Sequence, residues 1–509
     1  MLKEKIEMKK IGNQLIFPLE FLLSLLFTYV LFRFCIIKNY EGYHSLKHLI
    51  LMGIFGLAIF GIILYNGKMN KGKLEKIVIS FLIPIGMLYL VFMLPSQVPD
   101  EQVHLARAYE VSEGIFIGRK DSLSSVPKDF SEKIRPNVGT YKQASQGLAG
   151  NTNYQEKKDV RDSAATYPFI LYLFSSIGFL IARIFSLNIL LGCYLAKLMN
   201  FIVFLVAAYY ILKMIPFGKM AMTAIMFMPM FLHQATSTSA DCLVNIIIML
   251  FVAYLLHLRF KEENVKKSEG VFLVILGMII GIVKYVYLPI LGLALIFIPA
   301  KNMSKKYKII LLTTLFVLSI MVAGGYYMFS GTYETAFTNY FATNHVNAGE
   351  QIKGMIANPI GYFKTLKFTL SKMSEIYLYQ MIGNSLGWLC IGVKNIWITA
   401  YLIVMLASCF IEKNKVTLET WQKILGSLIA IGISLLIMTG MYITWTGVGN
   451  AIIDGVQGRY FIPVAIIVLL CLCKKDNYIK IKHIEYKLPI VLCLLNLPAL
   501  SAIYHAFMQ

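Results

Sequence analysis

Long apolar runs, separated by short polar or basic connections, dominate the hydrophobic pattern of this chain. Most of these runs are close to the length of about 20 residues that a helix needs to cross a bilayer. Inside lipid the backbone must satisfy its own hydrogen bonds, which favours helices over open sheets. The pattern therefore predicts an all-α, polytopic membrane helix bundle with about 13 transmembrane helices, in a range of about 11 to 14.

The predicted spans are the apolar runs that carry few or no charges. They cover residues 14–37, 49–65, 77–94, 189–212, 220–231, 242–258, 271–300 as a hairpin of two short helices, 309–329, 396–411, 424–443, 461–471 and 488–504. The chain then divides into two extra N-terminal transmembrane helices, a membrane core with two long outer loops, and a C-terminal transmembrane helix. These parts are residues 1–76, residues 77–475 with outer loops 96–188 and 330–394, and residues 476–509.

The charge balance indicates the orientation of the bundle. The 509 residues are 58% hydrophobic and only 15% charged, yet the net charge is +21. In a membrane protein such an excess indicates basic cytoplasmic loops, and no nucleic-acid partner is expected. Lysines concentrated in residues 2–10 place the N-terminus in the cytoplasm.

Segment 167–185 leaves two topologies open. If it spans the bilayer, strongly basic connections fall on the outside. If it lies along the outer face or re-enters it, all of the strongly basic connections fall inside, namely 259–269, 301–308, 412–423 and 474–487. The second topology satisfies the positive-inside rule throughout and is favoured. It also places Lys284 at the outer tip of the 271–300 hairpin.

The two long loops have patterns of their own. Residues 102–113 read as an amphipathic helix, and residues 351–370 as an amphipathic stretch that lies flat on the membrane. Residues 128–161 are rich in Gly, Asn and Ser and are expected to be mobile. Loops of this length in membrane proteins are more often functional than incidental.

Several classes of site are excluded by the sequence. The eight cysteines lie mostly inside apolar runs, so neither disulfides nor a structural metal is expected. The chain contains no P-loop, no dinucleotide-binding fingerprint and no His-Glu-x-x-His zinc motif. These absences argue against an ATPase, a kinase or a zinc protease.

The stretch 95–107 concentrates ionisable residues where the longest polar interval begins. A helix starting at its second proline places Asp100, His104 and Arg107 on one face, with Glu101 beside them. An equally open interpretation is an ordinary helix start, with acidic residues near the positive end of the helix dipole.

Further candidates lie next to predicted spans, where charge is costly. Asp241 and Lys284 each border an apolar run, and Arg459 follows two glycines that would let the backbone approach a ligand. The planar guanidinium of Arg459 suits a phosphate group. The alternatives are a helix N-cap for Asp241, a snorkelling side chain for Lys284 and an interfacial anchor for Arg459. Residues 383–388 are expected to form a break with an interfacial tryptophan.

Several motifs occur in the same order as in a widespread bacterial family of membrane proteins of unknown function, which this chain resembles over residues 75–475. The motifs are Pro99-Asp-Glu-x-x-His104-x-x-Arg107, Tyr167-Pro168, Ser239-Ala-Asp241, Lys284-Tyr-Val-Tyr-Leu-Pro289, Gly387-Trp388 and Gly455-Val-Gln-Gly-Arg-Tyr-Phe-Ile-Pro463. That family is in turn similar to the GT-C class of polyprenyl-phosphate-dependent glycosyltransferases. The resemblance implies a GT-C-like fold with outer-face juxtamembrane helices, in the bacterial cytoplasmic membrane, with its active face extracellular or periplasmic. The acidic motif follows the first span in GT-C enzymes and the third predicted span here, which suggests extra N-terminal helices.

The same resemblance implies an activity and residue roles. A sugar would pass from a polyprenyl-phosphate carrier to a cell-envelope glycan or glycopolymer, with Asp100 as the base and Glu101 positioning the acceptor. A divalent cation could bind at Asp100 and Glu101, and metal dependence stays open. The carrier phosphate would be bound by Lys284, Gln457, Arg459 and Tyr460, with support from His104, Arg107 and Asp241. The rival interpretations are a transporter or flippase for a lipid-linked polysaccharide and a non-catalytic assembly factor.

Overall fold

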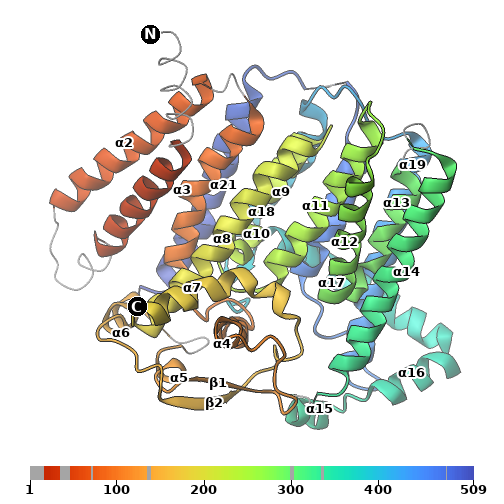
Figure 1. Cartoon of the computed structure of the whole chain (residues 1–509), viewed down its shortest axis with the longest axis horizontal. Helices are drawn as coiled ribbons and strands as arrows, with labels where there is room; N and C mark the ends of the chain where they lie inside the picture. The colour runs from red at the N-terminus through yellow and green to blue at the C-terminus, as the bar shows by residue number, and fades with distance from the viewer. Residues whose placement is uncertain are drawn as a thin grey trace.

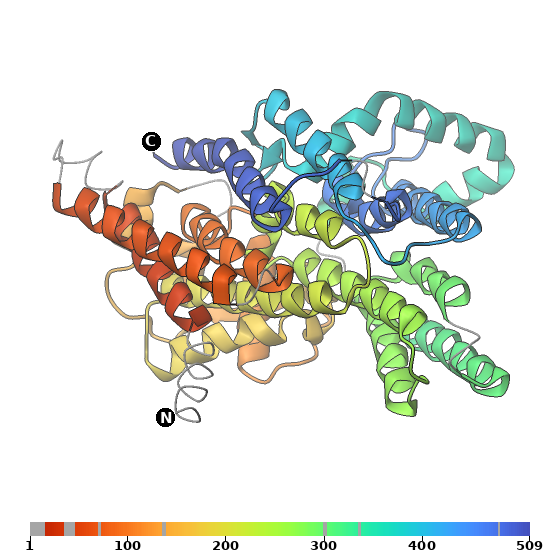
Figure 2. The ribbon, with the colours of Figure 1, turned by 90° about the horizontal axis from the view of Figure 1, so that it is seen from above.

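The computed structural model describes residues 16–34, 46–69, 73–134, 139–298, 303–333, 337–476 and 479–508. The predicted cytoplasmic N-terminus at residues 2–10 lies outside this part of the chain. Helices make up nearly all of the regular structure (Figure 1). Figure 2 shows an elongated bundle, with the red and orange N-terminal helices towards one end and the green helices of residues 267–330 towards the other.

A first helix, Ile16–Phe34, precedes the elements labelled in Figure 1. The helices are α2 (Leu46–Met69), α3 (Leu74–Phe92), α4 (Glu101–Ser112), α5 (Phe130–Lys133), α6 (Tyr141–Gly147), η1 (Phe169–Leu171), α7 (Leu173–Ile184), α8 (Ile189–Met214), α9 (Lys219–Met226), α10 (Pro229–Ala235), α11 (Ala240–Phe260), α12 (Lys267–Val283), η2 (Tyr285–Leu291), α13 (Gly292–Phe297), α14 (Lys305–Ser330), α15 (Thr338–Thr343), α16 (Ala348–Ala357), α17 (Pro359–Ile382), α18 (Asn395–Ile411), α19 (Thr420–Thr444), η3 (Gly458–Phe461), α20 (Ile462–Leu472) and α21 (Ile484–Ala506). The strands are β1 (Leu123–Pro127), β2 (Lys157–Arg161), β3 (Ser385–Leu386) and β4 (Ile391–Gly392).

Eight helices in the described part of the chain are long and apolar enough to cross a membrane. They are Ile16–Phe34, α2, α3, α8, α11, α14, α19 and α21. The other predicted spans are shorter or interrupted: α9 and α10 are separate helices, and 3-10 turns precede α13 and α20. The protein is therefore a predominantly helical membrane protein, and the count of about 13 spans stays a prediction.

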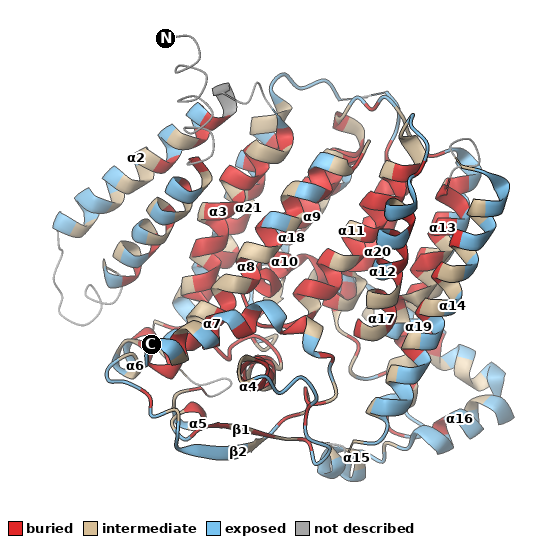
Figure 3. Cartoon of the chain, viewed as in Figure 1, coloured by how far each residue is buried: buried red, intermediate tan, exposed pale blue. Residues whose placement is uncertain are grey.

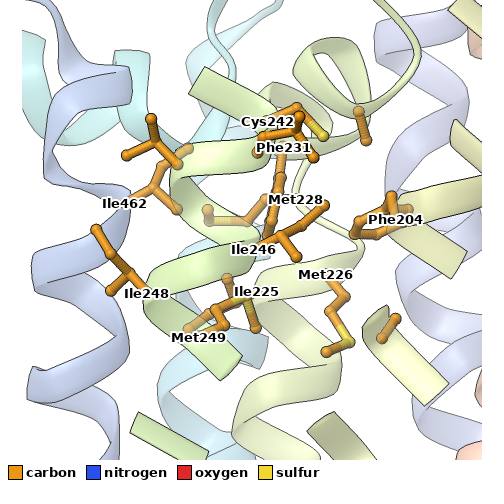
Figure 4. Close-up of a cluster of buried hydrophobic side chains, with 14 of the residues drawn as sticks. Phe204, Ile225, Met226, Met228, Phe231, Cys242, Ile246, Ile248, Met249 and Ile462 are labelled. Atoms are coloured by element: carbon orange, nitrogen blue, oxygen red, sulfur yellow. The ribbon is translucent and has the colours of Figure 1, made fainter. Parts of the chain in front are cut away.

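Buried residues, red in Figure 3, fill the centre of the bundle. Most of them are apolar residues from several helices, which form one hydrophobic cluster. Figure 4 shows one such cluster, in which Phe204, Met226, Phe231 and Met249 lie close together between α8, α9, α10 and α11. Lipid tails are as apolar as these side chains, so close packing, more than exclusion of water, stabilises such contacts in a membrane.

The basic connections meet at one end of the bundle. Arg259 Nη2 lies 3.4 Å from Glu419 Oε1, which joins the end of α11 to the start of α19. Lys423 Nζ donates to the carbonyl of Cys473 at 2.6 Å, and the Asn414 side chain donates to the carbonyl of Lys474 at 2.8 Å. The connections that the positive-inside rule groups together are therefore neighbours in space.

Both long loops lie at the opposite end, where α4, α5, β1, β2 and α15 gather below the long helices (Figure 1). Helix α7 has 12 residues, about 18 Å at 1.5 Å per residue, which is short of the roughly 30 Å hydrocarbon core. It also begins and ends at the loop end, since Tyr172 contacts His104 and Arg183 donates to the carbonyl of Ser112 at 2.8 Å. Segment 167–185 therefore does not span the bundle.

Residues 271–298, the described part of the predicted 271–300 hairpin, fold back on themselves. Helix α12 ends at Val283, Lys284 occupies the extended residue that follows, and η2 with α13 returns along the bundle. Lys308 Nζ donates to the carbonyl of Ile298 at 3.1 Å, which places the return of the hairpin at the basic end. Lys284 consequently sits at the loop end.

Two loop predictions need correction. Residues 128–161 contain α5, α6 and β2, which pairs with β1 in a two-stranded antiparallel sheet, whereas a mobile chain was expected. The amphipathic stretch 351–370 is divided between α16 and α17, because Pro359 starts a new helix that the side chain of Asn358 caps. Strand pairing determines the structure of the first segment, and helix capping determines that of the second. A hydrophobic pattern reveals neither.

Asp162, at the end of β2, makes the stability of the loop region depend on pH. Its carboxylate is buried, accepting from Ser124 Oγ at 2.6 Å and from the Ala164 amide at 2.7 Å, and burial raises its pKa to about 7. The protonated form is thus favoured on folding, so this stability is full below about pH 4 and is lost as the pH rises through 7. We expect Asp162→Asn to flatten the fall in melting temperature between pH 4.5 and 8. An unchanged slope would contradict this assignment.

Candidate functional site

Four charged side chains from distant parts of the sequence meet at the loop end of the bundle. Arg459 Nε lies 2.9 Å from Asp241 Oδ2, and Arg459 Nη2 lies 3.4 Å from Asp100 Oδ2. Lys284 Nζ donates to Asp241 Oδ1 at 2.9 Å. Asp241 therefore bridges the two cations, and Asp100 contacts only the guanidinium. We call Asp100, Asp241, Lys284 and Arg459 the charged cluster.

Each member of the cluster stands at a helix end, for local reasons. Asp100 precedes α4 in a left-handed conformation (φ 62°) that Asp tolerates better than most residues. Asp241 follows Ser239, whose side chain caps α11 by accepting from the Asp241 amide at 3.3 Å. The helix N-cap that was considered for Asp241 is thus supplied by Ser239. The Asp241 carboxylate belongs to the charged cluster instead. Lys284 adopts an extended conformation that ends α12.

Arg459 is the most enclosed member of the cluster, with only 5% of its side chain exposed. Among the described residues, Arg459 Nη1 finds no hydrogen-bond partner, and neither does the buried Oε1 of Gln457. The ring of Tyr460 lies 4.5 Å from Lys284 Nζ and 5.5 Å from Arg459 Cζ, measured to the ring centroid. A buried donor without a partner is costly, and an anionic ligand at this point would satisfy it.

The glycines before Arg459 serve packing, which corrects the expectation that they expose backbone to a ligand. A Cβ on Gly458 would lie 2.3 Å from the carbonyl oxygen of Tyr377 in α17. Gly455 has φ +76°, and a Cβ there would lie 2.2 Å from the Trp445 ring. Small residues at these positions let the 455–461 segment press against its neighbours.

His104 borders the cluster from α4. Its Nδ1 lies 2.7 Å from the Tyr172 hydroxyl, and its ring meets that of Tyr167 edge-on at 5.6 Å between centroids. Burial lowers the pKa of His104 to about 4, against the opposing effect of Asp100 and Asp241. The imidazole of His104 is thus neutral near pH 7. Its Nδ1 can either donate a hydrogen bond to the Tyr172 hydroxyl or accept one from it, depending on the tautomer.

The structure places Glu101 and Arg107 away from the cluster. Glu101 is fully buried and accepts from the Thr238 amide at 3.1 Å. Arg107 is also fully buried, where it pairs with Glu110 at 2.9 Å and donates to the carbonyls of Ile115 and Phe116. Sharing a helix face with Asp100 and His104 does not bring Arg107 to them, because its long side chain turns towards the loop after α4.

A divalent cation at Asp100 and Glu101 does not fit this geometry. The Asp100 side chain is 48% exposed and faces Arg459, whereas both Glu101 oxygens accept from buried amides. Within the described ranges, no group of three His, Cys, Asp or Glu side chains is arranged to hold a metal ion. Adjacent carboxylates that point apart cannot share one ion.

Three contributors to this region were missed as site residues. Tyr167 and Tyr172 contact His104, and a Tyr-Pro motif marks only the first of them. Lys197, inside α8, is fully buried and donates to the carbonyl of Leu90 at 3.1 Å. A single lysine deep in an apolar run was the available signal for Lys197, since such charges are functional candidates by default.

The predicted break at 383–388 is a short turn that supports the cluster. Strands β3 and β4 pair there, and Trp388 Nε1 donates to the carbonyl of Ser96 at 2.9 Å. The Gly387 amide donates to His233 Nε2 at 3.1 Å. The tryptophan therefore holds the 93–100 turn, and its interfacial position stays a prediction.

A family model described as "Predicted membrane protein (DUF2142)" matches residues 83–468. The chain belongs to the DUF2142 family. The matched region of this DUF2142 protein contains all four residues of the charged cluster, and it leaves out helix Ile16–Phe34, α2 and α21. No match was found among the curated proteins or among the solved structures.

Proposed function

We propose that this DUF2142 protein is a membrane glycosyltransferase that moves a sugar from a polyprenyl-phosphate carrier to a cell-envelope glycan. The charged cluster carries the proposal, because it joins a half-exposed carboxylate to a buried guanidinium that has an unpartnered donor. An acceptor hydroxyl needs a base, and a departing phosphate needs fixed positive charge. The resemblance of the motifs to GT-C enzymes suggests the same reaction class.

The chemistry assigns one role to each member of the cluster. The acceptor oxygen attacks the anomeric carbon, the bond from that carbon to the phosphate oxygen breaks, and the acceptor proton passes to Asp100. Arg459 and Lys284 stabilise the charge that develops on the departing phosphate, with Gln457 and Tyr460 beside it. Asp241 holds the two cations 2.9 Å from its own oxygens and keeps them in place before the carrier binds.

The proposed orientation follows from the two ends of the bundle. The end that carries the basic connections faces the cytoplasm under the positive-inside rule. The loop end, with the charged cluster, then faces the outside of the bacterial cytoplasmic membrane. Carrier lipid reaches this cluster from the bilayer, and a glycan acceptor reaches it from the outer aqueous phase.

The direct test is Asp100→Asn in purified protein reconstituted into vesicles with polyprenyl-phosphate-linked sugars and envelope glycan acceptors. Loss of the base should lower the transfer rate by about 10²- to 10⁴-fold. Asp121→Asn is a matched control, because Asp121 is an exposed loop carboxylate that pairs with Arg119. Full activity of Asp100→Asn would remove Asp100 from the mechanism. Movement of the carrier lipid across the vesicle membrane without sugar transfer would favour a flippase.

A further inference from the structure

The turn that presents Asp100 is strained and firmly held. Within residues 93–100, both Ser96 (φ 69°) and Asp100 (φ 62°) adopt left-handed backbone conformations without being glycines. Such a conformation is unfavourable for a residue that has a Cβ, and it persists only where the surroundings fix it. Trp388 fixes the middle of the turn through the carbonyl of Ser96. Two buried charged residues fix its ends.

Lys197 fixes the start of the turn. It lies in α8, its side chain is fully buried, and its ammonium group donates to the carbonyls of Leu90 and Met93. These carbonyls belong to the last residues of α3 and the residue after it, which lack helical partners of their own. A lysine at a helix C-terminus also interacts favourably with the helix dipole.

Glu101 fixes the end of the turn and joins it to α11. Its Oε2 accepts from the Val98 amide at 3.4 Å, inside the turn. Its Oε1 accepts from the Thr238 amide at 3.1 Å, three residues before Asp241. One carboxylate thus connects the segment that carries Asp100 to the segment that carries Asp241.

The two buried charges support each other. Burial raises the pKa of Glu101, and the positive charge of Lys197 opposes that rise. An uncompensated buried charge would be strongly destabilising. Loss of Glu101 or Lys197 should therefore weaken the hydrogen bonds that the remaining residue makes to the 93–100 turn. A glutamine at position 101 could accept from only one of the two amides and would point its own NH₂ group at the other.

We propose that Glu101 and Lys197 form a buried positioning pair that sets Asp100 against Arg459 and Asp241. Neither residue contacts substrate. This assignment rests on the proposed transfer reaction, and it explains an acidic residue next to Asp100 without a cation or a second catalytic carboxylate. It replaces the acceptor-positioning role that the resemblance suggested for Glu101.

The test compares Glu101→Gln, Lys197→Met and the double variant in reconstituted transfer assays. Each single variant should lower kcat by about tenfold or more, because small misplacements of a catalytic group are costly, while KM for the polyprenyl-phosphate sugar stays within about twofold. The double variant should be no slower than the slower single variant, since the pair acts as a unit.

Tyr401→Phe is the control: it removes a buried hydrogen bond of 2.7 Å to the carbonyl of Ala224, distant in sequence from the turn. The proposal would be overturned if the Glu101 and Lys197 variants lose kcat only in proportion to their fall in melting temperature, as the Tyr401→Phe control is expected to do.

Amide hydrogen exchange separates this proposal from the proposed function. Lys197→Met should speed exchange in residues 93–100 and also in 236–241, although Lys197 donates only to the first segment. If the wild-type protein transfers no sugar but both segments loosen in this variant, the positioning pair stands and the transferase assignment fails. If exchange in 236–241 is unchanged, Lys197 and Glu101 are not coupled and the proposal is wrong.

Discussion

Arg459→Lys is expected to lower sugar transfer by about 10²- to 10³-fold, as the loss of a preorganised donor to developing charge typically does. Lysine keeps the positive charge but offers a single nitrogen, whereas the guanidinium of Arg459 faces Asp241 through Nε and Asp100 through Nη2. The unpartnered Nη1 disappears as well. The measurement is the initial transfer rate in vesicles at saturating carrier.

The matched control for this prediction is Arg259→Lys. Arg259 also pairs with a carboxylate, Glu419, but at the basic end of the bundle and in a partly exposed setting. We expect this variant to transfer sugar at the wild-type rate. Equal rates for Arg459→Lys and Arg259→Lys would show that the fork geometry of Arg459 has no part in the reaction.

Asp241→Ala is expected to destabilise the fold by about 3–5 kcal/mol, because it leaves two largely buried cations without their shared partner. Asp241 lies within 2.9 Å of both Lys284 and Arg459, and only 14% of its side chain is exposed. The double variant Asp241→Ala/Lys284→Ala should recover part of this loss, since one unpaired charge is then removed. Thermal unfolding of the purified protein in one fixed detergent measures both effects.

Glu419→Ala provides the comparison for Asp241→Ala. Its carboxylate is 61% exposed, pairs with Arg259 at 3.4 Å and caps the start of α19, so its removal should cost no more than about 2 kcal/mol. A comparable loss of stability in the two variants would contradict the view that the charged cluster is a buried network. It would also remove the reason for assigning Asp241 a holding role.

The main apolar helices could be predicted from the sequence because lipid imposes simple rules, and the orientation of the bundle stays a prediction. Apolar length identified the long helices, and the grouping of lysines predicted the non-spanning 167–185 segment and the hairpin with Lys284 at its tip. The break between α9 and α10 had a signal that the hydrophobic pattern alone did not use: Pro229 starts α10, and proline disfavours a helical conformation in the residue before it. The sheet of β1 and β2 depends on pairing between segments that are distant in the chain.

The cluster was partly predictable for a related reason. Charges next to apolar runs are costly, so Asp241, Lys284 and Arg459 stood out, and the structure brings them together with Asp100. The directions of neighbouring side chains were not predictable. Glu101 turns inward and accepts from the Val98 and Thr238 amides, whereas Asp100, in a left-handed conformation just before α4, stays half-exposed. No pattern in the sequence reveals these directions.

The contact between the loop region and the end of α21 has a consequence for biosynthesis. The Tyr141 amide donates to the carbonyl of Phe507 at 2.9 Å, and the Tyr141 ring packs against Tyr504 and Phe507. The ribosome makes Tyr141 long before it makes Phe507, and residues are added one at a time. The first long loop therefore lacks these contacts during synthesis until the last helix has been made.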